Sequence, residues 1–82
     1  MQNQTVLRKH AALVDGMSDR LGVDLEEGVF RGEIAPDLIP DLVLRCTKCT
    51  DPEGCARKLA ANAQLDAAPS YCVNRDTLEK LR

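Results

Sequence analysis

The sequence is poor in aromatic residues. Phe30 and Tyr71 are the only two aromatic side chains among 82 residues, and tryptophan is absent. Aromatic side chains supply much of the buried area of a small domain, and a chain of this length has little core to spare. We therefore expect one domain, residues 1–82, that needs a source of stability besides apolar burial.

Long apolar runs and basic clusters are also missing. The longest apolar stretches span only a few residues and the first ten residues are polar, so neither a membrane span nor a signal peptide is expected. The 11 basic residues are spread along a chain of net charge -2, which argues against nucleic-acid binding. We expect a cytoplasmic protein, where thiols are ligands or redox groups more often than structural disulfides.

No catalytic motif is found. A Ser-His-Asp set, a glycine-rich phosphate loop and a zinc-hydrolase motif are all absent, so we do not expect an enzyme. The carboxylates of Asp24, Glu26 and Glu27 are explained by helix capping. His10 is the single histidine and lies far from the cysteines in sequence. It could be a ligand, but we expect a structural or exposed role.

Two helices are predicted in the N-terminal half. Apolar side chains recur at helical spacing over residues 5–21, so an amphipathic helix should end near Gly22. Asp24 is a favourable N-cap for a short second helix that continues to about Arg31. Gly32 should stop that helix.

Further helices are predicted in the C-terminal half. Residues 37–48 carry apolar side chains at helical spacing, so a third helix should begin at Pro36 or later and run into the first two cysteines. Asp51 followed by Pro52 predicts the start of an alanine-rich helix through roughly Gln64.

The end of the chain and the fold class follow from the remaining pattern. Asn74 is expected to cap a last short helix after a loop over residues 67–71. No window shows a convincing strand alternation. A short strand around residues 71–73 is the one open alternative. The fold class is therefore all-α, a small single-domain bundle of four to five short helices.

Four cysteines give the strongest functional signal, with the spacing C-x2-C-x5-C-x16-C: Cys46, Cys49, Cys55 and Cys72. If the third helix continued through Cys49, the first two Cβ atoms would lie about 5 to 6 Å apart on one face. Cys55 lies in the first turns of the fourth helix, where the helix dipole favours a thiolate. A centre bound by all four thiols would staple the C-terminal segment to the middle of the chain.

Three kinds of centre fit this spacing to different degrees. Structural zinc usually uses two tight cysteine pairs, and only one tight pair occurs here. A [4Fe-4S] cluster commonly takes three cysteines from one short segment and a fourth from a remote position, which fits better. A redox disulfide between Cys46 and Cys49 would be expected after a strand, which is not apparent. Four basic residues near the triplet could offset its charge or form ordinary solvated surface: Arg45, Lys48, Arg57 and Lys58.

Two resemblances bear on the choice. The triplet Cys46-x2-Cys49-x5-Cys55 is similar to that of WhiB-like regulators, which implies a [4Fe-4S] cluster, although the fourth cysteine follows the triplet here. The chain also resembles a small bacterial four-cysteine family that is uncharacterised, a domain of unknown function. That resemblance rests on four segments that cover much of the chain: residues 21–24, 45–49, 52–55 and 68–74.

These observations lead to one preferred interpretation and two alternatives. We expect an iron-sulfur protein whose four cysteines bind a [4Fe-4S] cluster for electron transfer or redox sensing, with a protein redox or regulatory partner. A zinc-stapled helical interaction module is the first alternative. A thiol-disulfide switch at Cys46 and Cys49 is the second. The sequence does not indicate an oligomeric state.

Overall fold

Residues 4–82 form five helices joined by turns and loops. A computed structural model describes residues 4–82, and no strand occurs in that range. This confirms the predicted all-α class. The helices are α1 (Gln4–Arg20), α2 (Leu25–Phe30), α3 (Leu38–Cys46), α4 (Pro52–Ala61) and α5 (Arg75–Lys80).

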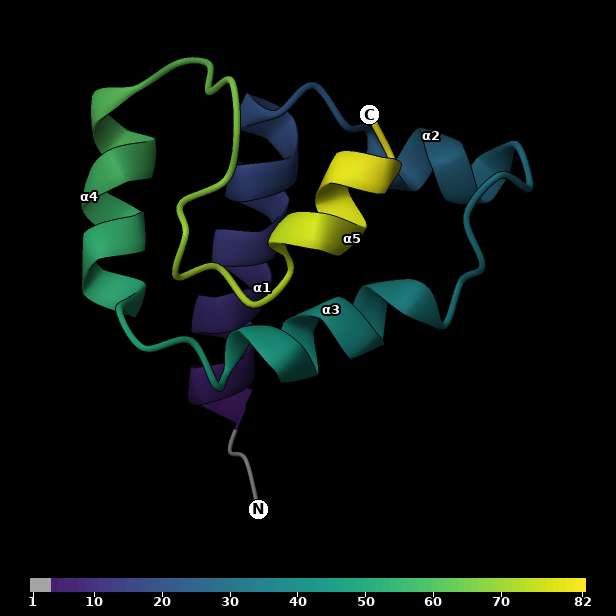
Figure 1. Ribbon diagram of the computed structural model, residues 1–82. Helices are drawn as coiled ribbons and strands as arrows, with labels where there is room; N and C mark the ends of the chain where they lie inside the picture. Colours follow the sequence, from purple (N-terminus) through teal and green to yellow (C-terminus); the bar gives the residue numbers. More distant parts are fainter. Residues whose placement is uncertain (1–3) are drawn as a thin grey trace.

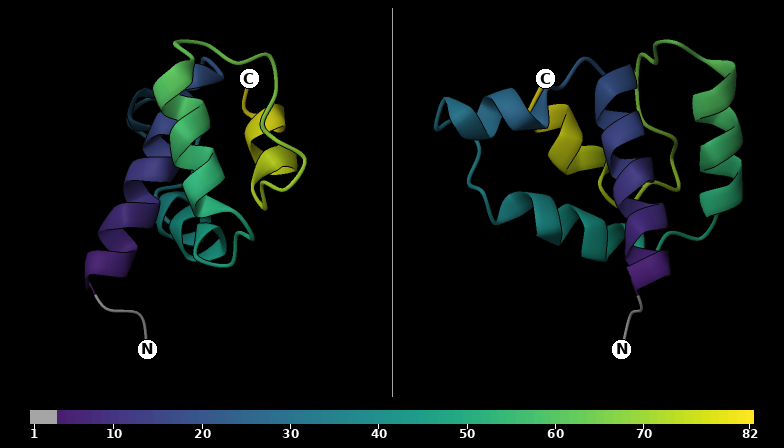
Figure 2. Two further views of the ribbon diagram at one scale, coloured as in Figure 1. Left: turned by 90° about the vertical axis from the view of Figure 1, so that its left-hand side faces the viewer. Right: turned by 180° about the vertical axis from the view of Figure 1, so that it is seen from behind.

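The long helix α1 organises the others. It runs through the molecule with α4 along one side and α3 crossing near its N-terminal half, and α5 lies above α3 in the view of Figure 1 (Figures 1 and 2). The contacts of α1 with α3 and α4 are the most extensive between helices. Among the described residues, no helix is long and apolar enough to cross a membrane.

Local capping signals set most helix ends where the sequence predicted them. The side chain of Asp24 accepts a hydrogen bond from the Glu27 backbone N–H at 3.0 Å and so caps α2. Asp51 caps α4 in the same way. Gly22 and Gly32 have φ angles of 78° and 75°, a region that glycine enters without steric cost after a helix end.

The helix α3 ends earlier than predicted. It stops at Cys46 and does not continue into Cys49. The Thr47 hydroxyl donates to the Leu44 carbonyl at 2.6 Å, and the Cys49 N–H donates to the Cys46 carbonyl at 3.0 Å, so the last turn is tightened. The chain must also leave the helical conformation before Pro52, because proline disfavours helix at the residue that precedes it.

The helix α4 is also shorter than predicted, ending at Ala61 and not at Gln64. Its last carbonyl groups are satisfied by side chains, so further helical turns are not needed. Arg20 donates to the Leu59 carbonyl at 3.1 Å and to the Asn62 carbonyl at 3.2 Å. The side chain of Asn62 donates to the Lys58 carbonyl at 2.8 Å.

Asn74 occupies the predicted cap position of α5, but its side chain makes no capping hydrogen bond. Its Nδ2 group donates instead to the Leu42 carbonyl at 2.8 Å. Asn74 is 2% exposed, so this buried bond ties the start of α5 to the middle of α3. The segment before it, residues 71–73, forms turns and not the strand left open by the sequence.

The core lies where α1, α3, α4 and α5 meet. Its buried apolar residues come from every helix and from the connecting loops: Leu13, Val14, Met17, Leu21, Val23, Leu25, Ile34, Leu42, Cys46, Cys55, Leu59, Ala68 and Leu78. Two cysteines are therefore part of the core. Phe30, one of the two aromatic residues, is 88% exposed and contributes little to it.

Replacement of Asp51 by alanine tests the cap of α4. The Asp51→Ala variant loses the hydrogen bond that the Gly54 N–H donates to Asp51 Oδ1 at 2.9 Å. We expect a loss of about 1 kcal/mol in the free energy of unfolding, measured by urea denaturation. Asp37→Ala is the matched control, because Asp37 precedes α3 without a side-chain cap bond and should change stability by less than about 0.5 kcal/mol. Equal losses of stability in the two variants would contradict the assignment of Asp51 as the cap of α4.

Replacement of Gly28 by alanine tests the packing of α2. An added Cβ would lie 2.8 Å from Ile34 Cγ1 and overlap Ile34 Cδ1. We expect Gly28→Ala to cost about 1–3 kcal/mol in thermal or urea unfolding. Combining it with Ile34→Ala removes both overlapping atoms, so the double variant should lose less than the sum of the single losses. Additive losses would show that the contact with Ile34 is not the cause of the stability loss in Gly28→Ala.

Candidate functional site

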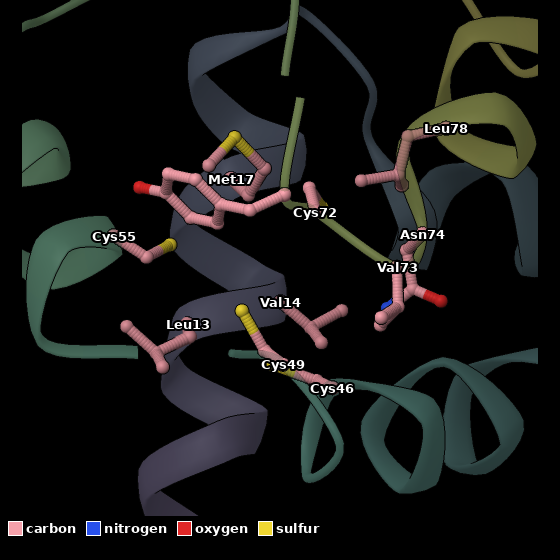
Figure 3. A pocket seen from close by; sticks show the side chains of 11 residues that line it. Leu13, Val14, Met17, Cys46, Cys49, Cys55, Cys72, Val73, Asn74 and Leu78 are labelled. Atoms are coloured by element: carbon pink, nitrogen blue, oxygen red, sulfur yellow. The ribbon is translucent and has the colours of Figure 1, made fainter. Parts of the chain in front are cut away.

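All four cysteines line one pocket (Figure 3). Cys46 is the last residue of α3, and Cys49 lies in the turn that follows. Cys55 lies in the first turn of α4, and Cys72 lies just before α5. The sulfur atoms of Cys49 and Cys55 point into the space between these segments (Figure 3). The predicted site residues thus come together from three separate parts of the chain.

Backbone hydrogen bonds hold the cysteine-bearing segments. The Cys55 N–H donates to the carbonyl of the N-cap residue Asp51 at 3.0 Å, and this bond fixes Cys55 at the start of α4. The Cys72 N–H donates to the Pro69 carbonyl at 3.0 Å. Together with the bond between Cys49 and Cys46, these contacts define the direction from which each thiol enters the pocket.

The rest of the pocket wall is uncharged. Three residues of α1 form its back, one residue of α5 closes it, and three residues come from the segment around Cys72: Leu13, Val14, Met17, Leu78, Tyr71, Val73 and Asn74. No Asp, Glu, Lys or Arg of the described chain lines this pocket. The thiols are therefore the only ionisable groups on the wall besides the Tyr71 phenol.

The four thiols differ in exposure. Cys46 and Cys55 are 8% and 7% exposed, whereas Cys49 and Cys72 are partly exposed, so the pocket reaches the surface beside the latter pair. The space that it encloses is about 20 Å³. A volume of this size holds about one water molecule or one ion.

The thiols share the pocket without converging on one point. Over residues 4–82, no group of three or more His, Cys, Asp or Glu side chains is arranged to hold a metal ion. All four cysteines are free thiols. To be bound by all four thiols, a centre would therefore have to span widely spaced sulfur atoms. Otherwise the cysteine side chains would have to rotate slightly about their Cα–Cβ bonds.

The pocket disfavours ionised thiols. Burial is the main cause that raises the pKa of Cys46 from 9.0 to about 12, and the nearby Cys49, Cys55 and Cys72 sulfurs add to it. Burial, followed by the charges of Cys72 and Cys49, raises the pKa of Cys55 to about 11. Burial also raises the pKa of Cys72. These three thiols are neutral near pH 7, and a bound cation is the agent that would ionise them.

His10 is a neighbour of the site that the sequence did not reveal. It is 6% exposed on α1, and its Nδ1 atom lies 3.3 Å from Cys46 Sγ. The sequence predicts a structural or exposed histidine, and the ring is buried and contacts one of the predicted ligands. The two residues are 36 positions apart and meet only because α1 packs against α3, so no local signal could have shown the contact.

The basic residues near the cysteines do not line the pocket. Arg45 forms an ion pair with Asp41 at 2.9 Å and donates to the Thr77 hydroxyl at 3.3 Å. The other three are exposed and do not line the pocket: Lys48, Arg57 and Lys58. They form solvated surface and do not compensate charge inside the site.

Comparisons with known proteins identify the family but no activity. Neither a search of curated proteins nor a search of solved structures found a match to this chain. The similarity of the cysteine triplet to WhiB-like proteins is not supported by any of the comparisons. A family model, described as a family of unknown function, matches residues 1–82. The chain therefore belongs to this family of unknown function, DUF6455.

Proposed function

We propose that this protein binds a [4Fe-4S] cluster through Cys46, Cys49, Cys55 and Cys72 and uses it in electron transfer or redox sensing. The observation that supports it most is that every cysteine of the chain lines the same pocket. Free cysteines that serve only as small core residues have no reason to gather from three segments. Ligands of one centre must do so.

The electrostatics of the pocket also favour binding of positively charged metal ions. Four thiolates in an apolar pocket repel one another, and no cationic side chain among the described residues lines this one. Iron or zinc ions would supply the missing positive charge, and their binding would release the thiol protons. Such binding energy would also be folding energy, because the thiols tie α3, α4 and the start of α5 to one point.

The arrangement of the thiols favours a cluster over a single ion. A tetrahedral zinc ion with Zn–S bonds of about 2.3 Å needs its sulfur atoms within roughly 4 Å of each other. The described thiols form no such tight set. A cubane cluster binds each thiolate at a different iron atom, so its ligands stand on opposite sides of a larger body. In sequence, three ligands from residues 46–55 and one from Cys72 follow the three-plus-one spacing that is common for such clusters.

The position of the pocket suits exchange of electrons with another protein. Cys49 and Cys72 are partly exposed, so a centre bound there would lie close to the surface. Lys48 is exposed directly beside Cys49 and offers a positive charge to a protein redox or regulatory partner. Four free thiols are suited to the reducing cytoplasm, which is the compartment we propose.

A zinc-stapled helical interaction module is the second candidate, and the pocket volume favours it. The enclosed space of about 20 Å³ admits a single ion without expansion. In this case zinc would only stabilise the fold, and function would lie in a partner-binding surface. A thiol-disulfide switch is less well supported, because the high pKa of Cys46 and the uncharged wall give it the properties of an inert thiol.

Metal analysis of protein purified without oxygen separates these candidates. We expect a brown protein that contains about four iron and four sulfide ions per chain and absorbs broadly in the visible range. Removing the metal with a chelator should greatly reduce the helical circular dichroism, because metal binding is coupled to folding. A colourless protein with about one zinc ion per chain would overturn the cluster and support the second candidate.

Single substitutions test the ligand set. Each of Cys46→Ala, Cys49→Ala, Cys55→Ala and Cys72→Ala should retain less than about a tenth of the wild-type iron under the same reconstitution. Ser70→Ala is a matched control, since Ser70 is exposed, lies near Cys72 and does not line the pocket. Metal-free wild-type protein whose mass falls by two hydrogens on oxidation would instead support the disulfide switch.

A further inference from the structure

His10 contacts the site but has no part in the proposed set of ligands. Its ring is 6% exposed, and Nδ1 lies 3.3 Å from Cys46 Sγ, within the range of a hydrogen bond to sulfur. The ring is carried by α1, the helix that also forms the back wall of the pocket. It therefore approaches the Cys46 sulfur from a fixed scaffold and not from a loop.

The direction of this hydrogen bond depends on the state of the sulfur. A neutral Cys46 thiol can donate its proton to Nδ1 or accept one from it. A metal-bound thiolate has no proton and can only accept, so the imidazole must then carry its proton on Nδ1. Binding of a centre would thus select one tautomer of His10.

Cys46 is the ligand that most needs such a donor. It is the last residue of α3, where the negative end of the helix dipole disfavours a thiolate. Cys55 has the opposite position, in the first turn of α4, where the dipole and free N–H groups favour one. A donor beside Cys46 would compensate for the unfavourable end of α3.

We propose that His10 is a positioning residue of the centre: its Nδ1–H group donates to the Cys46 thiolate, orients that sulfur and draws negative charge from it. This inference rests on the proposed function. Donation to a ligating sulfur stabilises the more negative, reduced form of a redox centre more than the oxidised form. His10 therefore raises the reduction potential of the bound centre and strengthens metal binding.

Two substitutions separate the hydrogen bond from simple packing. His10→Leu fills a similar buried volume without a donor, whereas His10→Asn places an amide N–H near the position of Nδ1. Ser18→Ala is the control, because Ser18 is also a buried polar residue of α1, but its hydroxyl donates to the Asp15 carbonyl and it does not line the pocket.

The measurements are iron content and midpoint potential of the four proteins after anaerobic reconstitution with iron and sulfide. We expect His10→Leu to bind metal 10–100-fold more weakly and to favour the oxidised centre about tenfold more, a shift of about -59 mV for one electron. His10→Asn should recover most of both losses, and Ser18→Ala should match the wild type. A wild-type potential in His10→Leu, or an equal loss in His10→Asn, would overturn the role of His10.

A second readout needs no variant. The chain contains one histidine, so the nitrogen NMR signals of its ring in loaded wild-type protein belong to His10. We expect Nδ1 to carry a proton, whereas the reverse tautomer carries its proton on Nε2 alone. The reverse tautomer would refute the proposal even if the centre itself is present, whereas wild-type protein that takes up no metal at all would overturn the proposed function on which it rests.

Discussion

The fold depends on the packing of α3 and α4 against α1, to which two buried thiols contribute. Neutral thiols behave as small hydrophobic groups, so Cys46 and Cys55 belong to the core that holds α3 and α4 to α1. In the proposed function, the same sulfur atoms would become ligands once a cation ionised them. One set of residues can therefore serve as core and as binding site, and the scarcity of aromatic residues in this chain makes that double role valuable for stability.

The parts of the fold that the sequence predicted correctly are those encoded by neighbouring residues. Asp24 and Asp51 cap helices through bonds that span three positions, and Gly22 and Gly32 adopt left-handed conformations where helices end. Two of the errors occur where distant groups contact the helix ends. α4 stops at Ala61 because Arg20, 39 positions before Leu59, satisfies its last carbonyls, and Asn74 bonds to α3 in preference to capping α5.

The same distinction applies to the site. Cysteine spacing was sufficient to select four candidate residues, and the structure brings all four to one pocket. The sequence did not reveal the uncharged wall, since Leu13, Met17 and Leu78 look like ordinary helical core residues in it. Nor did it reveal His10, whose contact with Cys46 arises from the crossing of α1 and α3. Ligands with a strong chemical preference can be recognised in a sequence, whereas their surroundings depend on packing.

The two candidate centres place opposite demands on this fold. A zinc ion would draw four thiols inward around a space of about 20 Å³, while a cluster would push them apart. Cys46 and Cys55 are buried on helices and can move little without disturbing the core. Cys49 and Cys72 lie outside the helices and are partly exposed, so either adjustment falls on them. The turn after α3 and the segment before α5 would therefore adapt the pocket to either proposed centre, while α1 keeps its wall and His10 in place.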